Sequence, residues 1–262
     1  MKGFKWFFII TACLGIGVGV AGLALYGFDF DQVGSDLRSE HQYEGRYMVL
    51  SQSDIDVLNF DIRGRNIIVR EGSQFRLDYY FSSHCRYIVN GNDTDNRPII
   101  VNRQLSFGLR QQFNFPMFNI QPARFHRIYV TVPAGFGGDI NIVGRSGNVN
   151  VENIGAGDLY VNMRSGNIRV ANVTADEITI TNRSGNIRLE NIRSNDIAVY
   201  NRSGNNTVSV VGNRNNFAIA LSHRSGRSTV NGARVVSNYT SPGSPGNITM
   251  NVRSGNNTLN FV

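Results

Sequence analysis

The sequence predicts an all-β protein whose main part is a β-solenoid, a stack of two-strand rungs, following an N-terminal transmembrane helix. The tetrapeptide Arg-Ser-Gly-Asn occurs four times at a fixed step of 19 residues, starting at Arg145, Arg164, Arg183 and Arg202. Apolar residues alternate with polar ones between these copies, which is typical of strands that bury one face. An uncharged stretch of 23 residues, 6–28, lies near the N-terminus.

The N-terminal stretch has the length and flanking charges of a membrane anchor. At 1.5 Å per residue, residues 6–28 span about 34 Å, which exceeds the roughly 30 Å hydrocarbon layer of a bilayer. Lys2 and Lys5 precede it, and Asp29 and Asp31 follow it. The positive-inside rule therefore places the N-terminus in the cytoplasm and the remainder outside. The alternative is a cleaved signal peptide, because Gly22-Leu23-Ala24 resembles a small-residue cleavage site.

Three parts are expected along the chain. Residues 1–28 form a cytoplasmic stub and a transmembrane signal-anchor, and the polar residues 29–53 form a tether. Strand-like alternation begins after residue 54 with Ile55 and Val57, and returns at 128–132. Residues 54–262 are therefore expected to form an extracytoplasmic β-strand-repeat domain, with regular repeats from residue 145.

Each 19-residue unit is predicted to hold two short strands joined by two turns. Four columns keep one chemical type, as expected when units stack: Val151, Val170, Leu189 and Val208; Ile154, Val173, Ile192 and Val211; Leu159, Ile178 and Ile197; and Val161, Ile180 and Val199. The Ser-Gly pair marks one turn, since Gly readily adopts a positive φ. The Asn after each Ser-Gly predicts a ladder of side-chain amides. The alternative fold, an antiparallel meander or sandwich, needs no such period.

Charge is distributed unevenly within the formal total of +7. Residues 145–262 contain 12 arginines and 6 acids and so carry +6, whereas residues 29–144 contain 12 arginines and 13 acids and carry −1. The candidate anion- or partner-binding residues are the arginines that begin each repeat: Arg145, Arg164, Arg183, Arg202, Arg224 and Arg253. Stacked guanidinium groups can bind phosphate or carboxylate, so this edge is expected to contact an anionic polymer or lipid headgroups. The alternative is that they are solvated turn residues.

A column of acids offers an alternative, enzymatic function. Asp158, Glu177 and Asp196 are 19 residues apart and are expected to stack at the opposite turn. Two of them could act as the carboxylate pair of a carbohydrate-active β-helix enzyme. No Walker-type or nucleophile-elbow motif is present, and the four histidines lack metal-ligand spacing. We therefore expect no enzyme activity, no cofactor and no metal.

An aromatic segment interrupts the strand pattern between residues 106 and 125. It contains Phe107, Phe113, Phe115, Phe118 and Phe125. An exposed aromatic loop is a candidate contact for a partner or a membrane. The alternative is a loop that caps the open end of the core, because repeat arrays must cover their ends.

The strand and turn motifs together resemble a known family. Asp54-Ile-Asp-Val57, Ile128-Tyr-Val-Thr-Val-Pro133 and the serial Ser-Gly-Asn units are similar to the bacterial putative-adhesin β-strand-repeat family, the LiaG-like or "toastrack" domain. The resemblance covers residues 54–262. It implies a non-catalytic, envelope-associated module, often membrane-anchored and linked to envelope stress, with no agreed ligand and no catalytic residues.

The expected setting is the outer side of a bacterial cytoplasmic membrane, reached by a single pass, or secretion if the N-terminal segment is cleaved. The expected partners are an envelope polymer, an anionic lipid or another envelope protein, and not a nucleic acid. Gly15 and Gly19 within the anchor would allow two helices to approach closely, so a homo-oligomer remains open.

Overall fold

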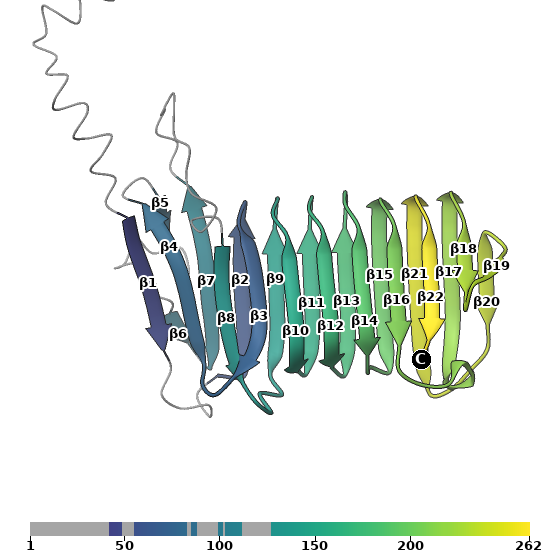
Figure 1. The fold of residues 1–262 in the computed structure, drawn as a ribbon, viewed down its shortest axis with the longest axis horizontal. Coiled ribbons are helices and arrows are strands. Elements are labelled where there is room, and N and C mark those ends of the chain that lie inside the picture. The colour runs from purple at the N-terminus through teal and green to yellow at the C-terminus, as the bar shows by residue number, and fades with distance from the viewer. Residues whose placement is uncertain (1–41, 49–54, 83–84, 88–98, 102, 112–126) are drawn as a thin grey trace, which may run out of the picture. The chain divides into compact units, whose positions relative to one another are not determined.

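Two long β-sheets stacked face to face form the part of the chain that the structure, a computed structural model, describes: residues 42–48, 55–82, 85–87, 99–101, 103–111 and 127–262 (Figure 1). The first sheet contains, in spatial order, β1 (Gln42–Met48), β4 (Arg76–Ser82), β8 (Arg127–Pro133), β3 (Asn66–Gly72), β10 (Val149–Gly155), β12 (Ile168–Thr174), β14 (Ile187–Ile192), β16 (Asn206–Val210), β22 (Asn257–Phe261), β18 (Ser228–Val230) and β19 (Ala233–Val235).

The second sheet is made by the other strand of each rung. It contains β20 (Asn238–Ser241), β17 (Phe217–Ser225), β21 (Gly246–Ser254), β15 (Asp196–Ser203), β13 (Glu177–Asn182), β11 (Asp158–Met163), β9 (Asp139–Gly144), β2 (Val57–Arg63), β7 (Gln104–Gln111) and β5 (Cys85–Tyr87), while β6 (Ile99–Val101) also pairs with β7. A 3-10 turn at Arg214–Asn216 precedes β17. Strand β1 lies within the range 29–53 for which a tether was expected.

The interior strands pair in parallel and in register, which confirms the predicted solenoid and excludes an antiparallel meander or sandwich. Val151 pairs with Val170, Val170 with Leu189, and Leu189 with Val208. In the second sheet Leu159 pairs with Ile178 and Ile178 with Ile197. A step of 19 residues therefore moves the chain by one rung, which is about 4.8 Å along the stack.

The core lies between the sheets and consists of the inward-facing residue of every second position. Val151, Val170, Val161 and Ile180 are all 0% exposed. Val, Ile and Leu dominate because branched side chains pack well on the pleated inner faces. Each stacked column buries its apolar surface only when the neighbouring rungs are present, so the stack is stabilised rung by rung.

One apolar column differs from the prediction by one residue. Ile154 pairs with Val173 as expected, but the partner of Ile192 is Val210 and not Val211. The cause is an extra residue in the regular units: Asn153, Asn172 and Asn191 have φ between 53° and 56° and form a bulge before the apolar residue. The unit that begins at Arg202 has no such Asn, so its inward residue comes one position earlier.

The glycines of the Ser-Gly turns occupy a place where no side chain fits. Gly166 and Gly185 have φ of 123° and 128°. A Cβ on Gly185 would lie 2.1 Å from the carbonyl oxygen of Gly166 in the next rung. The repeated Gly is therefore required both by the backbone conformation and by the close approach of successive turns.

The rungs do not stack in chain order at either end. At the C-terminal end, β15 and β16 pair with β21 and β22, and these pair in turn with β17 and β18. The last rung of the sequence thus lies between two earlier ones. At the other end, β2 and β3 lie between β7 and β8 on one side and β9 and β10 on the other.

Antiparallel strands cover both ends of the stack. β4 pairs with β8 and β1 with β4 at one end, and β19 and β20 pair with β18 and β17 at the other. Such short pairings block the free edge of a sheet from joining another chain. The described part of the chain contains no helix with the length and hydropathy of a membrane span, and the stretch 6–28 lies outside it.

The predicted aromatic loop is partly a strand. Phe107 belongs to β7, so the strand pattern continues through residue 111 where an interruption was expected. Phe113, Phe115, Phe118 and Phe125 lie outside the described residues. The backbone of β7 pairs with β2, which explains why the first aromatic residue of the group falls in the sheet.

Candidate functional site

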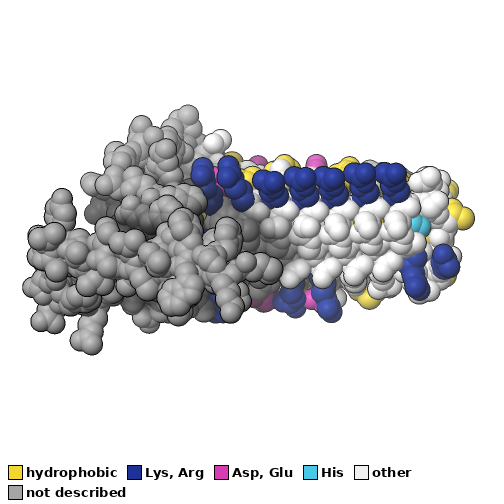
Figure 2. All heavy atoms as spheres, turned by 90° about the horizontal axis from the view of Figure 1, so that it is seen from above, with side chains coloured by type: hydrophobic (Ala, Val, Ile, Leu, Met, Phe, Trp, Pro, Cys, Tyr) yellow, Lys and Arg dark blue, Asp and Glu magenta, His cyan; other side chains and the backbone are white. Residues whose placement is uncertain are grey.

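The arginines that begin each repeat form one continuous row along the turns that join the second sheet to the first. Their order in space is Arg145, Arg164, Arg183, Arg202, Arg253 and Arg224, as fixed by strand register. All six are exposed. Figure 2, which views the turns end on, shows the line of evenly spaced basic side chains along the stack. At about 4.8 Å per rung the row spans roughly 24 Å.

The side chains of these arginines are unpaired among the residues that the structure describes. Within the described residues, none of the six side chains makes a hydrogen bond or an ion pair. Other arginines of the repeats are neutralised: Arg169 contacts Glu190 at 2.9 Å and Glu152 at 3.6 Å, and Arg188 contacts Glu190 at 2.6 Å. The row is thus an uncompensated line of positive charge, beside a sheet face on which charges are paired.

Arg63 continues the row by one rung and was missed in the sequence. The backbone N–H of Arg145 donates to the carbonyl oxygen of Arg63 at 2.9 Å, so the two turns are neighbours. Its turn reads Arg-Gly-Arg-Asn, which hides the motif. Unlike the other members, Arg63 has a carboxylate partner, since its Nε lies 3.4 Å from Asp61.

Buried asparagines stabilise two of the turns that present the row. Asn182 and Asn201 directly precede Arg183 and Arg202 and are 2% and 5% exposed. Each Nδ2 donates to a glycine carbonyl of the preceding turn, Gly166 or Gly185, at 2.9 Å. Because these two amides are satisfied within the core, they fix the turns from which Arg183 and Arg202 point outward.

The predicted asparagine ladder is present with a different bonding pattern. The Oδ1 of each Asn accepts the backbone N–H of the Asn one rung further, and Oδ1 of Asn205 also accepts the side-chain amide of Asn256 at 3.1 Å. The members are Asn66, Asn148, Asn167, Asn186, Asn205 and Asn256, and their bonds are 2.7–3.1 Å long. In the last bond, the backbone N–H of Arg227 donates to Oδ1 of Asn256 at 3.0 Å. The ladder locks the register of the turns beneath the arginines.

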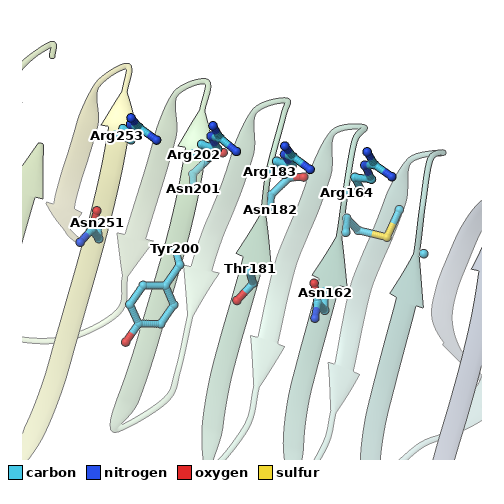
Figure 3. Close-up of a pocket in the computed structure, with 12 residues that line it drawn as sticks. Asn162, Arg164, Thr181, Asn182, Arg183, Tyr200, Asn201, Arg202, Asn251 and Arg253 are labelled. Atoms are coloured by element: carbon cyan, nitrogen blue, oxygen red, sulfur yellow. The ribbon is translucent and has the colours of Figure 1, made fainter. Parts of the chain in front are cut away.

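A groove of about 640 Å³ runs beside the row on the outer face of the second sheet (Figure 3). Arg164, Arg183, Arg202 and Arg253 border it at the turns. Two positions before each of them stand Asn162, Thr181, Tyr200 and Asn251, which form one column in register. This column was missed because its residue types vary, although its fixed spacing from each Arg is visible in the sequence.

The acids form a second row at the other end of the same strands. The register joins Asp158 to Glu177 and Glu177 to Asp196, and it adds Asp139, which was missed because its unit precedes the first Arg-Ser-Gly. Burial raises the pKa of Asp158, and the carboxylates of Asp139 and Glu177 raise it further. Neither the groove nor a second cavity of about 400 Å³ near Asp176 includes Asp158, Glu177 or Asp196.

No three of the described His, Cys, Asp and Glu side chains come together as a metal site. The acids make ordinary local bonds instead. Glu177 accepts from the hydroxyl of Thr179 at 2.7 Å, and Asp196 accepts from Nδ2 of Asn247 at 2.7 Å. The described residues therefore offer one coherent surface for a ligand, the arginine row with its groove.

Fold and surface together define a repeat β-solenoid with a basic edge. The model of the Toastrack (DUF4097) family matches residues 55–261, and the chain belongs to this family. No curated protein matches the chain.

Similar solved structures include a putative cell adhesion protein from Clostridium sporogenes, at 14% identity and a TM-score of 0.44, covering 84% of this chain and 100% of that one. A putative adhesin from Bacteroides fragilis is 15% identical with a TM-score of 0.41, covering 86% of this chain and 98% of that one.

Proposed function

We propose that this protein is a non-catalytic binding module of the bacterial cell envelope that holds anionic envelope material along its arginine row. The observation that carries the proposal is the row itself: six exposed arginines in register, none paired with an acid of the described residues. Guanidinium groups bind carboxylate and phosphate, and a line of them at strand spacing suits an extended anionic surface or chain.

The proposed setting is the outer side of the cytoplasmic membrane, with residues 1–28 as a single-pass anchor. The apolar stretch 6–28 and its flanking charges support this orientation. A link to envelope stress agrees with the Toastrack family and belongs to the same proposal. The names of the similar structures, adhesin and cell adhesion protein, are in keeping with binding rather than catalysis.

Binding can be tested with the full-length protein reconstituted into zwitterionic nanodiscs. Sedimentation with cell-wall polymer and with anionic liposomes, over a salt series, is expected to show association that weakens as salt rises. Replacing Arg164, Arg183 and Arg202 with Ser is expected to weaken it about three- to a hundredfold, since each exposed charge contact contributes about 0.2–1 kcal/mol. The matched control replaces Arg169, Arg188 and Arg193, which lie outside the row, and removes the same charge.

Two outcomes would contradict the proposal. If neither material binds, the row consists of solvated turn residues. If both triple variants weaken binding equally, net charge and not the row is responsible. The enzymatic alternative is examined with Asp158, Glu177 and Asp196 changed to Ala: a binding module retains its ligand, whereas an enzyme would lose turnover.

A further inference from the structure

The groove beside the arginine row presents uncharged hydrogen-bonding groups. Its inner column consists of Asn162, Thr181, Tyr200 and Asn251, none of which carries a charge. In Figure 3 these side chains lie lower on the outer face of the strands than the arginines at the turns. A ligand that lies along the stack would therefore meet cations on one side and neutral polar groups on the other.

The polar groups of this column are largely free to bind a ligand. Within the described residues, the side chains of Thr181, Tyr200 and Asn251 make no hydrogen bond. Asn162 uses its Nδ2 on the hydroxyl of Tyr160, at 3.0 Å, which leaves its Oδ1 as an acceptor. Hydroxyls and amides of this kind both donate and accept, so they suit a ligand that also carries hydroxyl groups.

Tyr200 adds an aromatic ring to the middle of the groove. It is 43% exposed, one of few large hydrophobic side chains so exposed among the described residues. A phenol ring combines an apolar body with a polar tip. The C–H face of a sugar ring is apolar and can pack on such a ring, whereas a chain of phosphates has no apolar face.

The groove and the row have the same direction and the same step. Both advance by one rung, about 4.8 Å, so equivalent groups recur along the axis of the stack. The final rung of the sequence supplies Asn251 and Arg253 beside Tyr200 and Arg202, because β21 lies next to β15. The site is therefore a continuous strip suited to a linear polymer with an anionic group every one or two rungs.

We propose that the arginine row and its groove bind an acidic polysaccharide, held as an extended chain along the axis of the stack. Its carboxylates contact the arginines, and its hydroxyls and ring faces contact the inner column with Tyr200. This inference rests on the proposed function and names the ligand class of the same site. Polyphosphate offers the anions alone and so leaves the inner column unused, and lipid headgroups form no linear chain of sugar rings that could lie along it.

The test compares soluble probes at one salt concentration, with the full-length protein in zwitterionic nanodiscs, and the two anionic probes are matched in their number of charges. The probes are polygalacturonate, its fully methyl-esterified neutral form and inorganic polyphosphate, with anionic-lipid vesicles as a further arm. Polygalacturonate is expected to bind at least tenfold more tightly than polyphosphate, and the neutral form to bind weakly. Affinity of defined-length fragments should rise until the fragment reaches the roughly 24 Å of the row.

Two variants distinguish the contribution of the groove to binding from that of the arginine row. Tyr200→Ala is expected to weaken polygalacturonate binding about two- to tenfold, and to leave polyphosphate binding unchanged. Tyr129→Ala, which removes a tyrosine from the other sheet, is the control. The triple Arg-to-Ser variant is expected to weaken both ligands.

Each contrary result has a distinct meaning. Equal affinity for polyphosphate, vesicles and polygalacturonate, or an unaffected Tyr200→Ala variant, would overturn the polysaccharide assignment and leave the anion-binding function standing. Loss of all binding in the wild type would overturn both. Tight binding of the neutral form would show that the arginines do not contribute to binding.

Discussion

The turn glycines make a prediction at the scale of single residues. Gly185→Ala forces a Cβ to within 2.1 Å of a backbone oxygen at a φ of 128°, so it is expected to destabilise the protein by more than about 2 kcal/mol. Gly155→Ala is the matched control, because nothing lies within 4 Å of the added Cβ. Denaturant unfolding measures both, and equal stability of the two variants would contradict the stacking of the turns.

The acid row predicts a pH dependence of stability. Because the folded state raises the pKa of Asp158, its charge opposes folding at neutral pH, and this opposition disappears as the pH falls through the folded pKa. Asp158→Asn is therefore expected to be more stable than the wild type at pH 7, by less than about 1 kcal/mol since the group is exposed. The difference should vanish near pH 3 in thermal unfolding.

The charge of Glu190 is expected to stabilise the folded protein, whereas that of Asp158 opposes folding. Burial alone would raise the pKa of Glu190, but hydrogen bonds and charge from Arg188 and Arg169 outweigh burial and lower it. Its stabilisation is present above the unfolded pKa and is lost as the pH falls through the folded pKa. Glu190→Gln is thus expected to destabilise the protein slightly at pH 7 and not at pH 3. A destabilisation that persists at pH 3 would show that packing, not charge, is responsible.

At the scale of elements, the asparagine ladder explains why the C-terminal rungs are not in chain order. The unit that begins at Arg224 has Arg227 where the others have Asn, and a guanidinium has no acceptor. If the rungs were stacked in chain order, Asn256 would lie next to Arg227. The backbone N–H of Asn256 would then have no side-chain acceptor. In the structure, the rung containing Asn256 lies between the rungs of Asn205 and Arg227. Arg227 is therefore at the end of the ladder, where no further acceptor is needed.

Buried polar residues support the same order. Asn206 and Asn257 are 0% exposed, and Nδ2 of Asn206 donates to Oδ1 of Asn257 at 2.8 Å. In turn, Nδ2 of Asn257 donates to the carbonyl oxygen of Ser222 at 2.8 Å. The regular rungs have Ile168 and Ile187 in this column, so the polar pair marks the rungs that belong beside each other.

The ladder can be tested within a regular rung. Asn186→Ala removes the acceptor of the Asn205 N–H and is expected to cost about 1 kcal/mol of unfolding free energy. Asn186→Asp keeps an acceptor oxygen and is expected to stay close to the wild type. Denaturant titration distinguishes them, and equal losses in the two variants would assign the effect to the conformation of the turn rather than to the acceptor.

The regular strands could be predicted from the sequence because equivalent residues recur every 19 positions and thereby show which residues pair. Columns such as Val151–Val170–Leu189 keep one chemical type because stacking places these residues in contact with one another. The order of the C-terminal rungs was not predicted, since it depends on one departure, Arg227, whose effect can be recognised only when the direction of the ladder is known. Of the site, the arginines were predicted and Tyr200 was not, because an outward column can vary without disturbing the core.

At the scale of the whole folded domain, the insertion of the last rung makes the C-terminal end cooperative. Deleting residues 246–262 removes β21 and β22, the parallel partners of β17 and β18. We expect amide hydrogens of 217–241 to lose protection from exchange, while those of β11 to β14 keep it. Retained protection in β17 would mean that it can pair directly with β15, against the observed order.

The two ends of the stack also restrict how this protein can change in evolution. Both ends depend on segments that double back between other rungs, so a unit added there would break existing pairings. The interior units that begin at Arg145, Arg164 and Arg183 share the same pattern, and duplication of one would insert a rung with its neighbours intact. Each duplication would add one guanidinium and about 4.8 Å of binding strip, so the valency towards a polymer can grow in whole steps.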